Sequence, residues 1–241
     1  MNLKTDAIVL SVQKLKDNSS LVNFYTREVG RSSFLLYGAH GKKHSNCAAY
    51  LHPLSVVNID VNLRNSRPLN TIREMRVADA NPELLFNPVK SALSFFMSEV
   101  LLQVLRTNER DEILFDFIRN SVLMLNESEK GLGNFHILFL IRLTRFLGFQ
   151  PDSFAPSQSD FFDLRQVEYT NVRPFHNQFL TPKDASQMRL LLRMNSRNYP
   201  LFRFTKGERT ETLKRILEYY KIHTESFGEI KSLEVLKEIF E

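Results

Sequence analysis

Residues 5–50 read TDAIVLSVQKLKDNSSLVNFYTREVGRSSFLLYGAHGKKHSNCAAY and carry the clearest strand pattern in the chain. Three runs rich in leucine, β-branched and aromatic residues follow one another there: Ala7–Lys14, Leu21–Thr26 and Ser33–Gly38. Turn-forming residues separate the runs, so the pattern predicts three antiparallel strands joined by tight turns. The third run leads into GAHGKKH, a loop with two glycines and two lysines. A small sheet that ends in a basic loop favours a polyanionic ligand over a small apolar one.

Two more strands are predicted before residue 80. Leu54–Leu63 alternates apolar and polar residues, which is typical of a half-buried antiparallel strand, and Asn70–Asp79 is a weaker fifth strand. Five short strands in about 80 residues favour a small Greek-key barrel, for which the five-stranded oligonucleotide-binding fold (OB-fold) is the candidate. We therefore expect residues 1–80 to form an OB-fold nucleic-acid-binding domain.

After residue 80 the alternation gives way to helical spacing, which predicts a helical domain over residues 81–241. The first helix is expected at Pro88–Arg106. A second follows Asn108, which is predicted to cap it. The residues predicted to face inward from this second helix are Ile113, Leu114, Phe117, Ile118 and Val122. A third helix is predicted at Asn134–Leu147, with Gly148 as its left-handed terminator.

Residues 150–180 have weak periodicity and many turn formers, so an irregular insertion is expected there, with a small hairpin over Phe161–Thr170. Thr181 is predicted to cap the next helix, because a proline and an acidic residue follow it. Two more helices are expected around Arg209–Tyr220 and Leu233–Phe240. The predicted fold class is thus α+β and multidomain, with an N-terminal five-stranded OB-fold β-barrel followed by an all-α C-terminal domain.

The composition indicates the class of protein and the compartment in which we expect it. Hydrophobic residues make up 43% of the chain and charged residues 24%, which is typical of a globular protein. No apolar run approaches the roughly 20 residues needed to span a bilayer, and the first residues lack the pattern of a secretory signal. The single cysteine, Cys47, excludes an internal disulfide and fits a reducing compartment. We expect a cytoplasmic protein with no membrane partner.

The positive charge is concentrated in the strand-rich part of the chain. Residues 1–80 contain eleven lysine and arginine residues against six aspartate and glutamate residues, while the remaining 161 residues contain 21 of each sign. The net charge of +5 therefore belongs to the predicted barrel. This asymmetry is expected of a nucleic-acid-binding surface, although a basic surface that serves solubility alone is the alternative.

Three segments resemble the RecO family of recombination mediators. AIVLSVQKLKDNSSLVNFYTREVGRSSFLLYGAHGKK resembles the family's N-terminal OB-fold, whereas FHILFLIRLTRFLGFQPD and YYKIHTESFGEIKSLEVL resemble its helical core and its ending. The resemblance implies a DNA repair protein, associated with the nucleoid, that binds single- and double-stranded DNA and anneals complementary strands. It also implies two protein partners, the acidic C-terminal tail of the single-stranded-DNA-binding protein and a RecR-type protein, with which the family helps to load the recombinase.

The resemblance leaves no cysteine site for zinc. Many RecO-like proteins carry four cysteines in the region that corresponds to residues 150–180, and this sequence has none there. We therefore predict no metal and no cofactor. The sequence also contains no nucleophile elbow, no HExxH and no paired CxxC, so we predict that the protein is not an enzyme.

The residues predicted to contact DNA are the basic side chains and one tyrosine on or near the first strands: Lys14, Lys16, Arg27, Arg31, Tyr37, Lys42, Lys43 and His44. Charge along a groove and an aromatic face for base stacking suffice for sequence-independent binding. Arg189, Arg193 and Arg197 are predicted to add a second contact, along one helix face if the helix extends that far. The alternatives are ordinary packing for the tyrosine and a solvated face for the arginines.

The residues predicted to bind the partner's tail lie in the third helix: Phe135, Phe139, Arg142, Arg145 and Phe146. Aromatic rings would line an apolar pocket, and the arginines would pair with carboxylates of the peptide. The alternative is that the two arginines merely cover the core with their stems.

Two rival functions remain open. One is a cysteine- or metal-dependent enzyme that uses the loop with His40, His44, Cys47 and His52. The other is a protein-interaction scaffold that binds no nucleic acid, in which case the charge asymmetry is incidental.

Overall fold

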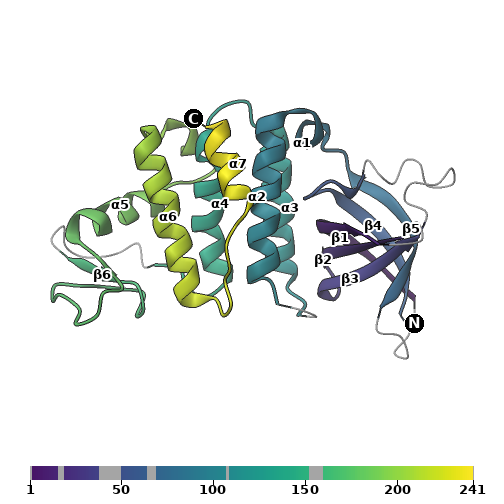
Figure 1. Cartoon of the computed structure of the whole chain (residues 1–241), viewed down its shortest axis with the longest axis horizontal. Helices are drawn as coiled ribbons and strands as arrows, with labels where there is room; N and C mark the ends of the chain where they lie inside the picture. Colours follow the sequence, from purple (N-terminus) through teal and green to yellow (C-terminus); the bar gives the residue numbers. More distant parts are fainter. Residues whose placement is uncertain are drawn as a thin grey trace. The chain divides into compact units, whose positions relative to one another are not determined.

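The structure is a computed structural model that describes residues 2–15, 19–37, 50–63, 69–106, 109–151 and 160–240. The chain divides into two compact units, and Figure 1 shows their elements. Unit 1 comprises Met1–Ser128 and Ile230–Ile239, and unit 2 comprises Glu129–Glu229 and Phe240–Glu241.

Five strands in unit 1 close into a barrel: β1 (Asn2–Lys14), β2 (Ser19–Thr26), β3 (Gly30–Tyr37), β4 (Val56–Asn62) and β5 (Asn70–Asp79). Their order is β1-β2-β3-β5-β4, and the β3–β5 pair is parallel whereas the other four pairs are antiparallel. The predicted five-stranded barrel is confirmed. β1 begins earlier than predicted, because its first half pairs with β4, from Asn2 opposite Asn62 to Ile8 opposite Val56.

The barrel encloses an apolar core built from alternate residues of its strands. Val22 and Phe24 of β2 are fully buried in it. The other core residues are Ala7, Val9, Phe34, Leu36, Val57, Ile59, Val61, Ile72 and Met75. Burying one large side chain of this kind stabilises the fold by roughly 1.5–3 kcal/mol. Because successive side chains of a strand point to opposite faces, Asn23 faces outward.

Four helices complete unit 1: α1 (Pro82–Phe86), α2 (Pro88–Val104), α3 (Glu112–Glu127) and α7 (Ser232–Ile239). α2 packs against β1 and α7 packs against α2 (Figure 1). Glu99 of α2 fixes the start of α7, because its two carboxylate oxygens accept hydrogen bonds from the backbone N–H groups of Lys231 and Ser232, both at 2.8 Å.

The start of α3 differs from the prediction. Asp111 caps the helix by accepting a hydrogen bond from the backbone N–H of Leu114 at 2.9 Å, so the predicted cap at Asn108 is wrong. Asn108 itself lies outside the described residues. Because the helix begins at Glu112, Ile113 falls in an exposed first turn.

This shift changes which side chains of α3 face inward. Ile113 is 74% exposed and Phe117 is half-buried, so the predicted inward position is wrong for the first and only partly met by the second. Phe115 is fully buried instead. The residues that are buried as predicted are Leu114, Ile118 and Val122.

The barrel approaches α3 closely at two points. The ring of Tyr25 in β2 stacks on Phe115 with centroids 6.1 Å apart, and its hydroxyl donates to the carbonyl of Asp111 at 3.4 Å. Gly30, the first residue of β3, has a φ of +66°, and a Cβ there would lie 2.1 Å from the carbonyl oxygen of Glu109, in the segment that leads into α3. Both the backbone conformation and the contact therefore require glycine.

Unit 2 contains the helices α4 (Leu132–Phe146), α5 (Pro182–Leu192) and α6 (Lys206–His223), the short 3-10 helix η2 (Tyr199–Leu201), and the strands β6 (Phe161–Asp163), β7 (Glu168–Thr170) and β8 (Phe179–Leu180). β6 and β7 form the predicted hairpin, and β8 pairs with the other side of β6. Gly148 follows α4 with a φ of +83°, as its predicted role as terminator requires. The predicted cap at Thr181 is also present, with its hydroxyl accepting from the N–H of Asp184 at 3.4 Å.

The interior of unit 2 surrounds α4. Tyr220 of α6 is fully buried and donates its hydroxyl proton to the carbonyl of Leu140 at 2.7 Å. His136 is buried as well, and its ring stacks on Phe240 with centroids 5.8 Å apart. The guanidinium of Arg209 lies 5.9 Å from the centre of the same phenyl ring. Burial, and secondarily the charge of Arg209, lowers the pKa of His136 to about 3.

The predicted border at residue 80 coincides with the end of β5, but the barrel shares its compact unit with α1, α2, α3 and α7. That residues 1–80 form a domain by themselves stays a prediction. In the parts of the chain that the structure describes, no helix combines the length and the apolar character needed to cross a membrane.

Candidate nucleic-acid interface

The outer face of β1, β2 and β3 has a covered end and an open end. At the covered end, Ile8 and Tyr25 lie opposite each other and are buried, with α2 against β1 and α3 against Tyr25. At the open end, Tyr37 is the last residue of β3 and is 53% exposed. Lys14, at the end of β1, is exposed and pairs with Ser20 of β2.

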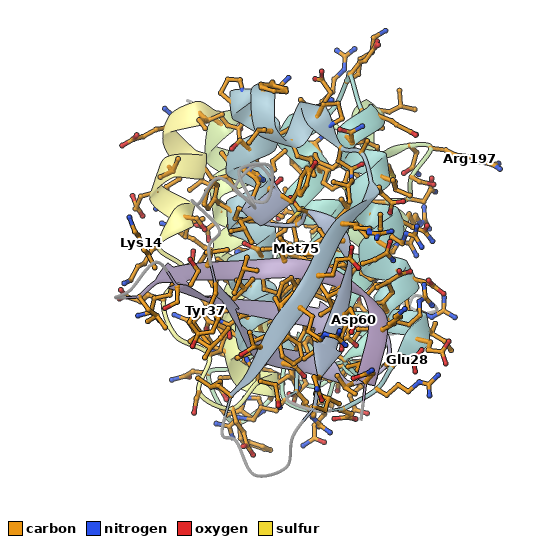
Figure 2. The ribbon with its side chains drawn as sticks, turned by 90° about the vertical axis from the view of Figure 1, so that its right-hand side faces the viewer. Lys14, Glu28, Tyr37, Asp60, Met75 and Arg197 are labelled. Atoms are coloured by element: carbon orange, nitrogen blue, oxygen red, sulfur yellow. The ribbon has the colours of Figure 1, made fainter. Side chains whose placement is uncertain are left out.

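Lys14 and Tyr37 come from strands on either side of the start of β2, since Tyr37 pairs with Ser19 and Lys14 with Ser20. Figure 2 shows Lys14 and Tyr37 toward one side of the barrel, and Asp60 and Glu28 toward the other. The structure therefore places a cation and an exposed aromatic ring that the sequence predicts as DNA contacts at the same end of the barrel. Lys14 is in register with Ser20 and the core residue Leu36, whereas Tyr37 alternates with the core, so the two side chains leave their strands on different faces.

The surface between the covered end and Tyr37 is uncharged and combines polar side chains with two leucines. A ladder of three side chains crosses it, in which Asn23 lies opposite Ser11 on one side and Ser33 on the other. Further residues that alternate with the core on these strands are Gln13, Leu21 and Leu35. No carboxylate is found among the described outward-facing residues of this open end, so nothing described there would repel a phosphate.

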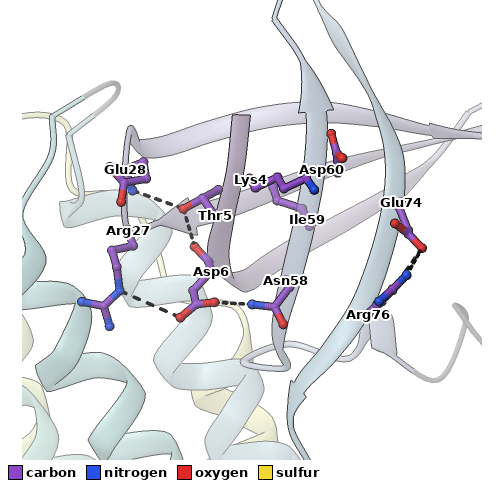
Figure 3. A pocket seen from close by; sticks show the side chains of 10 residues that line it. All are labelled: Lys4, Thr5, Asp6, Arg27, Glu28, Asn58, Ile59, Asp60, Glu74 and Arg76. Atoms are coloured by element: carbon purple, nitrogen blue, oxygen red, sulfur yellow. Dashed lines mark hydrogen bonds and ion pairs between the residues drawn. The ribbon is translucent and has the colours of Figure 1, made fainter. Parts of the chain in front are cut away.

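The opposite side of the barrel has a different character. A hollow of about 510 Å³ lies over β1, β4 and β5, and Figure 3 shows the side chains that line it. Its charged residues are four carboxylates and three cations: Asp6, Glu28, Asp60 and Glu74 against Lys4, Arg27 and Arg76. Its cations are partly engaged, since Arg76 and Glu74 are paired at 2.6 Å. A net negative hollow is a poor site for a polyanion.

Two of the arginines predicted to contact DNA make contacts that hold unit 1 together. Arg27 donates to Asp116 of α3 at 2.5 Å, and its guanidinium lies 4.5 Å from the centre of the Phe115 ring. This hydrogen bond also holds the pKa of Asp116 below its usual value. Arg31 donates to the backbone carbonyl of Leu102 in α2. We therefore leave both arginines out of the proposed interface.

Of the residues predicted for the basic loop and for the rival enzyme site, the structure describes only His52. Residues Lys16, Lys42, Lys43 and His44, together with His40 and Cys47, lie outside the described residues. His52 is half-buried, with its Nδ1 atom 2.8 Å from the carbonyl of Pro53 and its Nε2 atom 3.1 Å from the hydroxyl of Ser91. Burial lowers its pKa. Both ring nitrogens thus have protein partners, and the residues described include no group of three His, Cys or acidic side chains that would hold a metal ion.

The arginine stripe is not a helix face. α5 ends at Leu192, so Arg193 stands at its C-cap and Arg197 lies in the following turn. The helix stops there because two asparagine side chains form hydrogen bonds with the backbone of the following turn. The Nδ2 group of Asn198 donates to the carbonyl of Arg193 at 3.0 Å, and Asn195 Oδ1 accepts from the N–H of Arg197 at 2.9 Å.

The three arginines also differ in exposure. Arg193 and Arg197 are exposed, whereas Arg189 is partly buried with its guanidinium 4.9 Å from the centre of the Tyr169 ring. Only the first two remain candidates for a second contact with nucleic acid.

Two of the five predicted peptide-binding residues of α4 lie inside the helical core. Phe135 and Phe139 are 0% and 2% exposed. Arg142 is half-buried, and its Nε and Nη2 atoms donate to the carbonyl of Met194 at 3.1 and 2.5 Å. Arg145 is exposed and Phe146 is half-buried. The arrangement favours the alternative in which Arg142 supports the core, while Arg145 and Phe146 keep accessible surface.

The fold and the open barrel face together define a protein of the oligonucleotide-binding-barrel class with a helical C-terminal region. Two family models match nearly the whole chain: "Recombination protein O N terminal" over residues 1–81 and "Recombination protein O C terminal" over residues 85–234. The chain belongs to the RecO family of DNA repair proteins. The predicted family is thereby confirmed.

Similar proteins match over their full length. The DNA repair protein RecO of Phocaeicola vulgatus is 35% identical over 237 residues, which are 98% of each chain. The protein of the same name from Azobacteroides pseudotrichonymphae is 35% identical over 241 residues, and that of Flavobacterium psychrophilum is 30% identical over 242 residues, with both chains covered completely in each case.

Proposed function

We propose that this protein is a mediator of recombinational DNA repair that binds single-stranded DNA across the open end of the β1–β2–β3 face. The proposal rests chiefly on the exposed ring of Tyr37, on a face with no carboxylate among its described outward-facing residues, and on the exposed Lys14 at the same end of the barrel. Phosphates require nearby cations, and bases stack on exposed aromatic rings. OB-folds in general bind oligonucleotides on the face of their second and third strands.

The wider activity follows from the family. The protein binds double-stranded DNA as well, anneals complementary strands, and helps to load the recombinase onto strands that the single-stranded-DNA-binding protein has coated, together with a RecR-type partner. Annealing requires contacts for two strands, and the exposed Arg193 and Arg197 in unit 2 supply the second. This work needs no catalytic group, metal or cofactor, and it takes place at the nucleoid in the cytoplasm.

The partner's acidic tail binds at α4 in this proposal. Because Phe135 and Phe139 are enclosed and Arg142 holds Met194, the tail meets Arg145 and Phe146, which have accessible surface. The arginine pairs with a carboxylate of the tail, and the half-buried ring offers it an apolar contact.

A salt-titrated binding assay with a labelled single strand tests the DNA contact. Lys14→Ala removes one cation from the strand's path, so the slope of log affinity against log salt should become shallower by about 0.7. Tyr37→Ala removes a stacking surface worth about 1–3 kcal/mol, so affinity should fall roughly 5- to 150-fold at every salt concentration.

Lys4→Ala is the matched control, because Lys4 is an exposed lysine of the same strand that faces the hollow with four carboxylates. Its removal should leave both affinity and slope unchanged. Equal effects of the Lys4 and Lys14 substitutions would show that the strand does not follow the open end. Absence of any salt-dependent binding by the wild-type protein would favour the scaffold that binds no nucleic acid.

A further inference from the structure

Asn23 is held from both sides by the two neighbouring strands. Its Nδ2 group donates to the hydroxyl of Ser11 in β1 at 2.8 Å, and its Oδ1 atom accepts from the hydroxyl of Ser33 in β3 at 2.5 Å. An amide bound on both edges cannot turn freely about its last torsion. The ladder thus presents a polar group in a fixed orientation on a face that is otherwise neutral.

The ladder leaves half of the amide's hydrogen-bonding capacity unused. An asparagine amide offers two N–H donors and a carbonyl with two lone pairs. Ser11 and Ser33 take one of each, so one donor and one acceptor remain next to each other. Because Val22 and Phe24 point into the barrel core, Asn23 points away from it, and it is only partly buried. The remaining donor and acceptor therefore face the surface on which we place the DNA strand.

A donor beside an acceptor is complementary to the Watson–Crick edge of a base. Adenine and cytosine present an amino donor next to a ring-nitrogen acceptor, whereas guanine and thymine present a ring N–H next to a carbonyl. We propose that Asn23 makes two hydrogen bonds to the Watson–Crick edge of an unpaired base, a mode by which proteins recognise single strands. This inference rests on the proposed function and adds the recognised group to it.

This contact would select for strandedness and not for sequence. All four bases offer one donor and one acceptor on that edge, so a base that approaches in either orientation satisfies the amide. In a duplex the edge is occupied by the complementary base and is closed to Asn23. The contact is therefore released when the bound strand pairs, as a protein that anneals strands requires.

The position of Asn23 fits a strand that also stacks on Tyr37. Asn23 lies opposite Ser33, and Tyr37 is four residues further along the same strand. At about 3.3 Å per residue this separation is roughly 13 Å. One single strand that crosses the open end can reach both.

The experiment compares the wild-type protein with Asn23→Ala on three probes of equal length: a mixed-sequence single strand, the corresponding duplex, and a single strand with abasic sites in place of its bases. The substitution should weaken binding of the mixed-sequence strand about tenfold, the size of one bidentate base contact. It should leave binding of the duplex and of the abasic strand unchanged. The salt dependence should not change either, because no phosphate contact is lost.

A second variant tests whether a loss of affinity comes from the missing base contact or from misfolding. Asn23→Thr keeps a hydroxyl in the ladder and suits a strand, but it lacks the adjacent donor and acceptor, so it should show the same base-dependent loss. Melting curves should show that both variants are fully folded at the temperature of the binding assay.

The possible failures are distinguishable. If both variants bind the mixed-sequence strand as tightly as the wild type, or lose affinity for the abasic strand equally, the inference is wrong while the proposed function stands. If the wild type binds none of the probes, both are overturned.

Discussion

The buried imidazole of His136 should make unit 2 sensitive to mild acid. In the folded protein its pKa is lowered to about 3, mainly because burial disfavours the charged ring. In the unfolded chain the pKa returns to about 6.5. The unfolded state therefore binds the proton more readily, and folding stability is complete above pH 6.5 and falls as the pH drops below it.

The expected loss follows from the difference between the two pKa values. Each pH unit between 6.5 and 3 costs about 1.36 kcal/mol, so at pH 5 the free energy of unfolding should be lower by about 2 kcal/mol than at neutral pH. Most carboxylates titrate below this range, so they contribute little between pH 7 and pH 5. His52, whose pKa is also lowered by burial, contributes in the same direction.

A non-titrating variant isolates the part that belongs to His136. Urea unfolding of the wild type, of His136→Gln and of His136→Leu should be followed at several pH values from 7 to 5. The variants differ from the wild type in absolute stability, so the quantity to compare is the change in the free energy of unfolding with pH. Other titrating groups contribute equally to the wild type and to each variant, and their contributions cancel in the difference. The difference between the wild type and either variant should change by about 2 kcal/mol over this range. A constant difference would show that His136 is not the acid-sensitive group.

Two further perturbations test a contact in each unit. Gly30→Ala should lower the free energy of unfolding by at least about 2 kcal/mol, because it combines a left-handed backbone with the close approach to the carbonyl of Glu109; Gly207→Ala, where no atom lies within 4 Å, is the control and should be neutral or stabilising in urea unfolding. Arg145→Glu should lower the affinity for an acidic peptide that ends in an aromatic residue about tenfold, measured by calorimetry, with naked-DNA binding intact. A folded Arg145→Glu protein that takes the peptide as tightly as the wild type would show that the tail binds elsewhere.

The parts of the fold that the sequence predicted well depend on signals within a few residues. Gly148 ends a helix and Thr181 begins one through bonds to their own neighbours, so a local pattern is sufficient. The cap of α3 was missed because Asn108 and Asp111 are both acceptable caps, and the choice is coupled to the packing of Phe115 against Tyr25. The contact between Phe115 and Tyr25 depends on the tertiary structure, so the sequence around α3 alone does not reveal it.

Prediction of the candidate site has the same limit, because local sequence patterns do not reveal contacts between distant segments. Charge and strand position predict Lys14 and Tyr37, and the structure places both at the open end of the barrel. The positive charge of Arg27 predicts a DNA contact, and its ion pair with Asp116 is not predicted because that partner lies 89 residues away in the sequence. Charge and aromatic character do not single out Asn23, although the alternation of β2 indicates that it faces outward. Its hydroxyl partners depend on the register of three strands, which no single segment specifies.

The attachment of α7 to α2 makes unit 1 discontinuous along the chain. The helices of unit 1 are complete only when Glu99 accepts hydrogen bonds from the backbone N–H groups of Lys231 and Ser232, and unit 2 lies between the two parts of unit 1 in the sequence. During synthesis the barrel strands leave the ribosome long before α7 does, so unit 1 must wait for most of unit 2 before its last helix can dock. Shortening the chain before residue 230 would therefore leave α2 of unit 1 without the helix that packs on it, and the effect would not be confined to the end of the protein.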